Sequence, residues 1–521
     1  MGGMTALLGD CDTGWHIRTG EWIFANHGVP FHDMFSFSKP GAPWLAFDWL
    51  SAVVFAWLNG HGGLRTVVLF SVVLLSVTFT LLFRLIRLQS NAILAIAITV
   101  LAAVASSIHW MARPHLFTLL FVVLFYGALL KVAGGHTKVA GIPYLVLLPA
   151  GMILWTNLHG GFFAGILMVA VFGVGEVSRL VFTGNAEEGP AGWRKARWYF
   201  LCAAACLGAS LINPYTYRLH LHLVEFLRAP VNANYILEYL SPNFHNSTIA
   251  VFEVVLVLAA VAAYWCFSQG HFTEPLLLAM WAHAALLAER NIPIFAIVAA
   301  VPVARSMGEW LERLPSSDAA EWLRGLAGRF NRLAASTSET EAVGRWHLIC
   351  AAAVLLVAAV IWAPNPPKTF RAEFDPSRYP AGALETLRRD PSARIFTDDE
   401  WGDYLIWSLY PSHKVFVDGR NDFYGQDFEA RFIDVLNVKY DWEKTLGGFG
   451  VDTILLPINA PLAGALKQSI RWSVVFDDGV ALVFRSAGKH VDSVGSVVNG
   501  RAAAAGRSAS LQPAPHRPGV G

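Results

Sequence analysis

Residues 64–84 of the chain read LRTVVLFSVVLLSVTFTLLFR. A helix needs about 20 apolar residues to cross the hydrocarbon core of a bilayer, and this run has that length. The whole chain of 521 residues is 55% hydrophobic and 15% charged, with a mean hydropathy of +0.45. Because soluble globular proteins carry about 25% charged residues, this composition indicates that lipid surrounds most of the chain.

Further apolar stretches predict a polytopic bundle. The stretch 274–306 is nearly continuous but contains Glu289, Arg290 and Pro293. Two charges at the centre of one long helix would be costly in lipid, so we expect a tight hairpin of two helices. The predicted transmembrane helices, about ten in number, cover 64–84, 92–108, 115–133, 142–157, 162–183, 198–213, 249–267, 274–289, 291–306 and 346–363.

The distribution of Lys and Arg predicts the orientation, because cytoplasmic loops are enriched in both. If 64–84 runs from outside to inside, the loops between helices on the outer side hold only Arg113, Arg218, Arg228 and Arg290. Residues 1–63 and everything after 363 then lie outside. The cytoplasmic side collects Arg84, Arg87, Lys131, Lys138, Arg179, Arg194, Lys195, Arg197, Arg305, Arg313, Arg324, Arg329, Arg332 and Arg345.

These assignments divide the chain into segments. Met1–Leu8 look like the tail of a helix whose start lies upstream, so we expect a first transmembrane helix that this sequence lacks; the alternative is unassisted export of a short N-terminal segment. The expected segments are an outer N-terminal segment with an interfacial helix over 44–58 (1–63), the transmembrane bundle (64–306), a cytoplasmic linker (307–345), the last transmembrane helix (346–363), a periplasmic α/β domain (364–486) and a disordered tail rich in Ala, Gly, Ser and Pro (487–521).

The sequence after the last span alternates between strand patterns and helix patterns. Alternating strands and helices of this length predict a small α/β sandwich. The fold class is therefore mainly α, a polytopic transmembrane helical bundle with a small C-terminal α/β domain. The expected elements are helix 380–389, strand 394–397, helix 401–409, strand 414–418, helix 427–437, strand 452–456, helix 461–468 and a hairpin over 472–485 that turns at Asp478-Gly479.

Uncommon polar clusters stand at helix ends, and the expected topology puts all of them outside. Aromatic, His, Asp and Arg side chains gathered on one face of a membrane can form a cavity at the boundary between water and lipid. A ligand with an apolar tail and a polar head would fit there. The clusters are Asp10–His16, Phe47–Trp49, His109–His115, Asn157–Gly161, Asn213–Tyr215 and Glu289–Asn291.

Three carboxylates are candidate catalytic groups. Asp10 and Asp12 could act as a general base on an acceptor hydroxyl, or hold a divalent cation such as Mg or Mn between them. The alternative is that one caps the following helix and the other is solvated. Asp48 shares the segment with His16, although an interfacial helix also tolerates an Asp on its polar face.

The outer cations and amides are candidate substrate-binding groups. Guanidinium groups bind phosphate oxygens in a bidentate manner, although an isolated Arg more often reaches for lipid headgroups. Beside His159, Gly160 and Gly161 allow a ligand to approach the backbone, and helix packing explains them equally well. The candidates are His16, Arg113, His115, His159, Arg290 and Asn291.

The remaining patterns are less informative. The segments Thr397–Asp403 and Val417–Asp422 follow strands and so map to the edge where open α/β sheets bind ligands, but turn and helix-cap chemistry is the favoured interpretation. The five cysteines show neither metal-ligand spacing nor a disulfide pattern. A net charge of +1 without a long basic block argues against nucleic acid as a partner.

Taken together, the motifs resemble those of bacterial integral membrane glycosyltransferases of the GT-C type, which include lipid-linked arabinose, mannose and galacturonic acid transferases. The likeness is to a poorly characterised branch. The motifs are D-x-D-T-x-W-H…T-G-x-W-I (Asp10–Ile23), R-P-H-L-F (Arg113–Phe117), N-L-H-G-G (Asn157–Gly161), N-P-Y (Asn213–Tyr215), R-N-I-P (Arg290–Pro293) and V-D-G-R (Val417–Arg420).

This resemblance implies an inverting enzyme of the bacterial cytoplasmic (inner) membrane. Such enzymes take a sugar from a polyprenyl-phosphate carrier and transfer it to an envelope glycan, lipid or protein acceptor on the outer side. Their essential acidic residue lies in the first outer loop, which implies Asp10 or Asp12 as base or metal ligand. Arg113 and Arg290 would then bind the carrier phosphate. The expectation that the first helix lies upstream of this sequence would be a departure from the family pattern.

Two other functions stay open. A transporter or flippase of an amphiphilic envelope lipid would share the topology, but the sequence shows no charged residue in mid-span as a coupling site. A non-enzymatic membrane scaffold could use the outer domain to bind an envelope polymer or another protein. Replacing Asp10 or Asp12 by Asn should abolish sugar transfer but leave transport or binding intact.

Overall fold

Helices make up most of the chain. The structure, a computed structural model, describes residues 3–183, 189–228, 236–343 and 346–487. The expected disordered tail, 487–521, lies outside these ranges except for its first residue. The expected fold class is confirmed: a mainly helical, multi-pass bundle is followed by a small domain with a mixed sheet.

Every expected transmembrane stretch contains a helix. In the described ranges, six helices are long and apolar enough to cross a membrane, and Tyr144–Leu158, Thr273–Leu287 and Ala352–Ile361 are shorter apolar helices. The bundle helices are α3 (Leu64–Arg87), α4 (Ala92–Ser106), α5 (His115–Ala133), α6 (Tyr144–Leu158), α7 (Phe163–Thr183), α8 (Gly189–Ala209), α11 (Ala250–Ser268), α12 (Thr273–Leu287), α13 (Ile292–Arg313) and α15 (Trp346–Ile361).

The predicted hairpin at 274–306 is present. Helix α12 ends at Leu287, and α13 begins at Ile292 after the short 3-10 helix η6 (Glu289–Asn291). The Asn291 side-chain amide donates a hydrogen bond to the Ala284 carbonyl at 3.0 Å, which supplies a partner for the end of α12. Proline in the first turn of α13 costs no hydrogen bond, because the N–H of that turn has no helical partner.

Helix α13 runs through the middle of the bundle. Its side chains are buried continuously from Ile292 to Ala304, and it packs against α4, α11 and α12. Small residues such as Ala296 and Ala299 let the neighbouring backbones approach, which is the usual way in which helices pack in lipid. Among the candidate spans in the described ranges, Glu289–Ser316 is thus the most buried.

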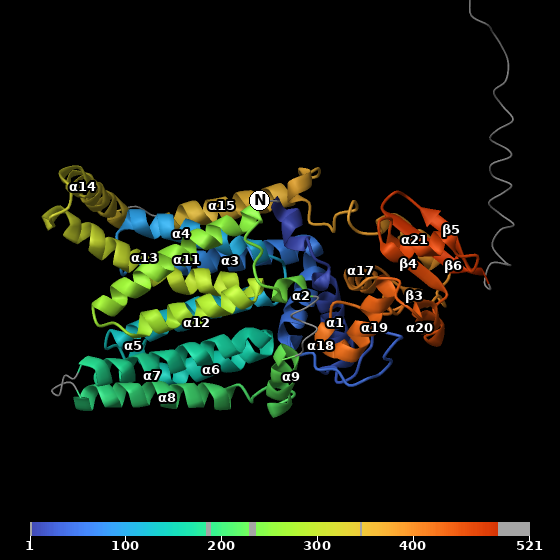
Figure 1. Cartoon of the computed structure of the whole chain (residues 1–521), viewed down its shortest axis with the longest axis horizontal. Coiled ribbons are helices and arrows are strands. Elements are labelled where there is room, and N and C mark those ends of the chain that lie inside the picture. Colours follow the sequence, from blue (N-terminus) through green and yellow to red (C-terminus); the bar gives the residue numbers. More distant parts are fainter. Residues whose placement is uncertain (1–2, 184–188, 229–235, 344–345, 488–521) are drawn as a thin grey trace, which may run out of the picture.

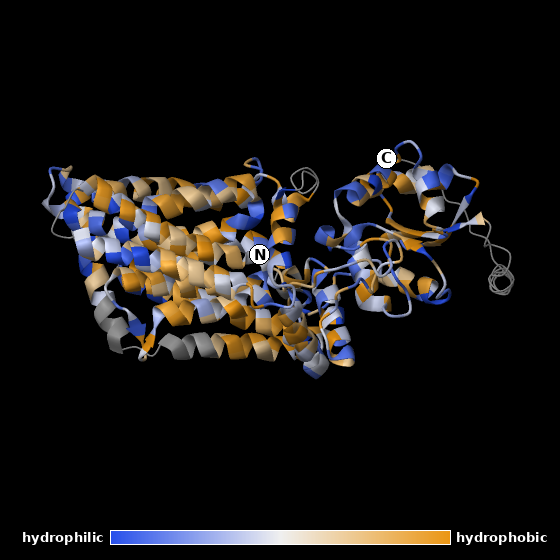
Figure 2. Ribbon diagram, turned by 90° about the horizontal axis from the view of Figure 1, so that it is seen from below, coloured by the Kyte–Doolittle hydropathy of each residue, from blue (hydrophilic) through white to orange (hydrophobic). Residues whose placement is uncertain are grey.

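The two ends of the bundle differ. Connections alternate between them, and the C-terminal domain lies beyond one end, which we call the domain end (Figure 1). The connections at residues 107–114, 159–162, 210–216 and 288–291 all lie there. The opposite end, the far end, holds the short strands β1 (Lys138–Val139) and β2 (Ile142–Pro143) and the helix α14 (Glu321–Val343). Hydrophobic residues fill the middle of the bundle, and the far end is more hydrophilic (Figure 2).

The N-terminal segment lies between the bundle and the domain. It contains the 3-10 helix η1 (Gly3–Leu8) and the helices α1 (Asp12–Asn26) and α2 (Trp49–Gly62), which pack against each other. The helix expected over 44–58 therefore starts and ends later than the sequence indicated. Its start is delayed because the Trp49 N–H is bound by the Ala46 carbonyl in a turn at 3.0 Å.

The C-terminal domain contains a four-stranded sheet in the order β3-β4-β6-β5. Strands β3 and β4 are parallel, whereas β4–β6 and β6–β5 are antiparallel. Helices α18 and α20 were not expected. The elements are α16 (Leu384–Arg388), β3 (Ile395–Phe396), α17 (Asp399–Leu409), α18 (Asn421–Tyr424), α19 (Gln426–Leu436), α20 (Trp442–Gly448), β4 (Thr453–Pro457), α21 (Pro461–Gln468), β5 (Trp472–Asp477) and β6 (Ala481–Ser486).

The strand expected over 414–418 is reduced to single bridges, and one of them involves the N-terminal segment. Val415 forms parallel bridges with Ile395 on one side and with Ser36 on the other. The Phe37 N–H donates to the Val415 carbonyl at 2.9 Å, and the Val415 N–H donates to the Phe35 carbonyl at 3.0 Å. A segment near the start of the chain thereby extends the sheet of the C-terminal domain.

A buried arginine strengthens this junction. Arg420 is 1% exposed, and its Nε and Nη2 each lie 2.7 Å from an oxygen of Asp418. Nη2 also lies 2.7 Å from Asp33 Oδ1, in the N-terminal segment. The guanidinium stands over the Trp44 ring at 4.5 Å from its centroid. A buried charge needs a partner of opposite charge. The contact of Arg420 with Asp33 therefore holds the N-terminal segment against the C-terminal domain.

Candidate functional site

Arg113 is the centre of an ion-pair cluster at the domain end. It follows the short 3-10 helix η2 (Ser107–His109) between α4 and α5. Its Nη1 lies 3.2 Å from Asp10 Oδ2 and 3.4 Å from Glu238 Oε2, and its Nη2 contacts Asp12 Oδ2. Three segments far apart in the sequence meet at this one side chain. We call Asp10, Asp12, His109, Arg113, Glu238 and Arg290 the arginine cluster.

Glu238 connects the two outer arginines. It lies on the short 3-10 helix η4 (Leu237–Tyr239), and its Oε1 is 3.0 Å from Arg290 Nη1. Its Oε2 is also 3.5 Å from His109 Nε2. Burial would raise the pKa of Glu238, but the two guanidinium groups outweigh it and lower the pKa to about 2. Glu238 is therefore an ionised carboxylate that both arginines share.

The backbone places the two aspartates at the start of α1. Asp10 Oδ1 accepts the Asp12 N–H at 2.7 Å, and Asp12 Oδ1 accepts the Trp15 indole N–H at 3.2 Å. The helix N-terminus favours negative charge here. Asp10 thus takes part of the capping role considered as the alternative. The loop before α5 is fixed in turn, because Thr13 Oγ1 donates to the Ala112 carbonyl at 2.8 Å.

The carboxylates do not fit a shared divalent cation as they stand. The guanidinium of Arg113 lies against both Asp10 and Asp12, where a bridging cation would have to sit. Across the described ranges, no group of three or more His, Cys, Asp or Glu side chains is placed to hold a metal ion. Mg²⁺ requires a near-octahedral set of oxygen ligands, and this arrangement offers two carboxylates and a cation.

Asp48 and His159 lie close to the cluster without joining it. Asp48 precedes α2 and is half-buried. Burial of its carboxyl raises its pKa well above the usual range, and Asp422 adds to this effect. His159 Nδ1 is 2.8 Å from Thr118 Oγ1 and accepts the Gly161 N–H at 3.0 Å. Burial, with help from Arg290, lowers the pKa of His159 to about 3, so His159 is neutral at physiological pH.

Three of the expected substrate-binding residues face elsewhere. His16 is buried against Trp15, with ring centroids 3.6 Å apart. His115 Nε2 lies 2.7 Å from the His109 carbonyl, and Asn291 binds the end of α12 as described. These side chains support the elements that carry Asp12, Arg113 and Arg290, and they are not members of the arginine cluster.

The C-terminal domain completes the site. Asp403 on α17 accepts the Gly419 N–H at 3.0 Å through Oδ1. A Cβ at Gly419 would stand 2.5 Å from Asp12 Oδ1 and 2.6 Å from Asp403 Oδ2, so both carboxyl groups converge on this glycine. Burial, followed by the charge of Asp418, raises the pKa of Asp403 well above its usual range. A carboxyl of the domain with a raised pKa therefore stands beside Asp12.

The sequence did not single out Glu238, and it favoured another role for Asp403. Asp403 belongs to a segment for which turn and cap chemistry was favoured over ligand binding, and Asp398 does cap α17 by accepting the Trp401 N–H at 2.7 Å. The signal for Asp403 was its place after a strand, which an open sheet often uses for ligands. Glu238 had no local signal, because its partners Arg113 and Arg290 come from distant loops.

A second contact links helix α9 (Tyr217–Arg228) to the domain. His222 on α9 lies 2.9 Å from Asp422 on α18. Burial would lower the pKa of His222, but the hydrogen bond and charge of Asp422 raise it overall. Helix α9 is therefore connected to the domain by this pair.

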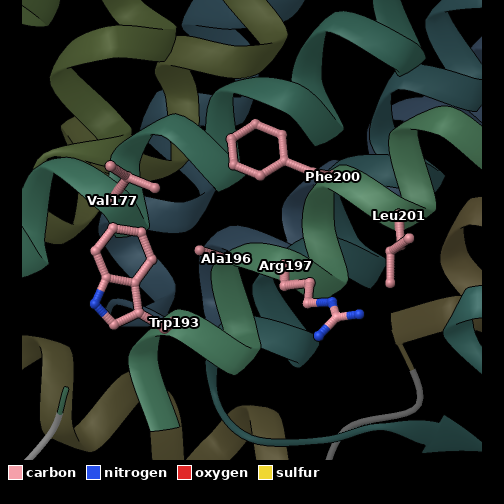
Figure 3. A pocket seen from close by; sticks show the side chains of 6 residues that line it. All are labelled: Val177, Trp193, Ala196, Arg197, Phe200 and Leu201. Atoms are coloured by element: carbon pink, nitrogen blue, oxygen red, sulfur yellow. The ribbon is translucent and has the colours of Figure 1, made fainter. Parts of the chain in front are cut away.

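An apolar groove of about 330 Å³ opens between α7 and α8 towards the far end of the bundle (Figure 3). It shares no residue with the arginine cluster. Its lining residues are Val177, Trp193, Ala196, Arg197, Phe200 and Leu201.

These features define a class: a multi-pass membrane protein with an ion-pair cluster between its helical bundle and a small α/β domain. No protein-family profile and no curated protein matches the sequence. The fold, however, is similar to that of archaeal oligosaccharyltransferases. The expected likeness to multi-spanning GT-C glycosyltransferases is thus confirmed at the level of the fold.

Two solved structures carry this comparison. The oligosaccharyltransferase of Archaeoglobus fulgidus, tethered to an acceptor peptide, matches 87% of this chain and 65% of its own, with a TM-score of 0.53 and 14% identity. AglB from the same organism, in complex with an inhibitory peptide and a dolichol-phosphate, matches 93% of this chain and 71% of its own, with a TM-score of 0.50 and 13% identity. The chain thus spans just under two thirds of the first of these proteins.

Proposed function

We propose that this protein is a membrane glycosyltransferase that takes a sugar from a polyprenyl-phosphate carrier. The acceptor is a hydroxyl group of an envelope glycan, lipid or protein. The reaction occurs on the outer side of a bacterial cytoplasmic membrane, with the C-terminal domain on that side. The fold similarity supports the class, and the AglB structure holds a dolichol-phosphate, which is a lipid phosphate of the proposed kind.

The observation that carries this proposal is the meeting of Asp12 with Arg113 at the domain end. The contact joins a carboxylate at the start of α1 to a guanidinium from the α4–α5 connection, and Arg290 stands on the other side of Glu238. A carboxylate can accept a proton from an attacking hydroxyl. Arginine can stabilise charge on a departing phosphate. The cluster therefore contains both groups that the transfer needs.

The proposed reaction is a single displacement at the anomeric carbon. The acceptor oxygen forms a bond to this carbon while the bond from the carbon to the phosphate oxygen breaks. The hydroxyl proton passes to Asp12, and the electron pair leaves with the polyprenyl phosphate, next to Arg113 and Arg290. Attack from the face opposite the phosphate inverts the configuration of the sugar. Asp10 holds the Asp12 backbone through its N–H and thereby orients the base.

The groups beside the cluster have supporting roles in this proposal. His159 donates from Nε2, because its Nδ1 accepts the Gly161 N–H. It adds no charge that would compete with the carrier phosphate for the arginines, because its pKa is lowered to about 3. The Asp403 carboxyl stands beside Asp12 on the domain side, at Gly419. The proposed transfer has no step through a metal ion, because Arg113 lies against both aspartates where a bridging cation would have to sit.

The test is mass spectrometry of carrier lipids and envelope glycans from a strain that lacks the gene. Expression of the Asp12→Asn variant should leave the glycosylated carrier to accumulate, with transfer reduced by about a hundredfold or more, because the general base is lost. Asp427→Asn removes an exposed carboxylate from α19 and serves as the matched control. Transfer at the wild-type rate by the Asp12→Asn variant would exclude this catalytic role and favour a scaffold or a transporter.

A further inference from the structure

Glu238 occupies the position that a phosphate group would take between two arginines. One carboxylate oxygen lies 3.0 Å from Arg290 Nη1 and the other lies 3.4 Å from Arg113 Nη1. Carboxylate and phosphate oxygens bind guanidinium N–H groups with the same geometry. An acidic side chain of the protein itself thus fills the binding geometry that two phosphate oxygens would use.

The charges of the arginine cluster favour a phosphate that replaces the Glu238 carboxylate over a phosphate that binds beside it. Asp10, Asp12 and Glu238 already place three carboxyl groups around the guanidiniums of Arg113 and Arg290. A phosphate that entered while Glu238 stayed would bring a fourth acidic group into a largely buried space. Like charges at such distances repel strongly where the dielectric constant is low. Replacing the Glu238 carboxylate by the phosphodiester of a sugar-carrying lipid keeps the formal charge unchanged, and a phosphomonoester adds at most about one negative charge.

Glu238 can leave by a side-chain rotation alone. Its side chain is 23% exposed, so water is within reach. The backbone of η4 is fixed, because the Glu289 N–H donates to the Leu240 carbonyl at 3.0 Å. Arg290 keeps a second support, since its guanidinium stands over the Tyr239 ring at 4.4 Å from the centroid. The arginines therefore retain their positions when the carboxylate turns away.

We propose that Glu238 is an internal competitor for the carrier phosphate, which binds between Arg113 and Arg290 by displacing the Glu238 carboxylate. The inference rests on the proposed function and adds a specificity device to it. A lipid without a phosphate has nothing with which to replace the carboxylate. Only the molecules in which the Glu238 carboxylate has left the arginines can bind the carrier. The apparent affinity for the carrier is then lowered in proportion to that fraction.

The experiment measures binding of farnesyl phosphate to the purified full chain in detergent by calorimetry, with farnesol as the probe that lacks the phosphate. Glu238→Gln and Glu238→Ala should bind farnesyl phosphate about tenfold more tightly than the wild type, because no carboxylate at position 238 then competes for the two arginines. Their farnesol binding should not change. Glu253→Gln, an exposed acid in the first turn of α11, is the matched control and should behave as the wild type.

The outcomes separate the inference from the proposed function. If the wild type binds farnesyl phosphate better than farnesol and the Glu238 variants bind it equally or less tightly, Glu238 is a support for the arginines and the competitor is excluded. If neither the wild type nor the Glu238 variants prefer farnesyl phosphate to farnesol, the arginines do not take a phosphate. That result would overturn the inference together with the phosphate role assigned above.

Discussion

Single arginines determine how the distant parts of this chain meet. Arg113 joins three carboxylates from two other segments, and Arg420 joins Asp418 to Asp33 across the junction of domain and N-terminal segment. The planar guanidinium suits both places, because its five N–H groups reach several acceptors in fixed directions. Arg113 is partly exposed, whereas Arg420 is fully buried.

Arg420→Met should destabilise the protein by about 3–5 kcal/mol, because the carboxylates of Asp418 and Asp33 stay buried without their cation. Arg420→Lys should lose less stability, because the positive charge remains although the bidentate contact with Asp418 is lost. Thermal unfolding of the purified protein in detergent measures the effect, with the exposed Arg431→Met as the control. An unchanged unfolding temperature for Arg420→Met would show that the junction is held by other contacts.

At this scale the sequence predicted part of the site. Asp10, Asp12, Arg113 and Arg290 were expected on one face, and they meet there because helix ends on one side of a bundle are neighbours. Glu238 could not be predicted, because its role depends on how a loop folds over two other loops. His16 and His115 looked like ligands by composition, but burial directs them to the protein interior.

Helices follow from local sequence more directly than their contacts do. The ten apolar runs all became helices, because a chain in lipid must satisfy its backbone hydrogen bonds internally. The boundaries of α2 and the loss of a strand at 414–418 depend on tertiary contacts instead. Val415 pairs on one side with a residue near the N-terminus, and no pattern within 414–418 encodes that partner.

The crossing of α1 and α2 depends on Gly20. A Cβ at this position would collide with the Ala52 carbonyl and with the Ala56 side chain. Gly20→Ala should therefore force the helices apart and cost about 1–3 kcal/mol. Gly60→Ala in α2 is the matched control, since a Cβ there meets nothing within 4 Å. Because α1 begins with Asp12, sugar transfer should fall together with the unfolding temperature in Gly20→Ala only.

An unfolding temperature for Gly20→Ala equal to that of Gly60→Ala would contradict the close approach of the two helices. Retained stability with lost transfer would show that the crossing orients Asp12 without contributing to the folding free energy.

The whole molecule has a polar site at one end and basic connections at the other. The bundle, the N-terminal segment and the C-terminal domain all contribute acidic or basic groups to the domain end, from Arg113 to Asp12 and Asp403. The sequence predicted this division from the positions of its Lys and Arg residues. It could not predict that residues 35–37 extend the sheet of the domain, because that contact spans most of the chain.

The central claim is that the arginine cluster and the C-terminal domain lie together on the outer side of the membrane. The most direct test is labelling of single cysteine variants in intact cells with a maleimide that does not cross the membrane. Three exposed positions serve: His245 after η4, Ser377 in the domain and Gln89 between α3 and α4. We predict labelling of His245→Cys and Ser377→Cys in intact cells, and of Gln89→Cys only after permeabilisation. Labelling of His245→Cys and Ser377→Cys from opposite sides of the membrane would contradict the account.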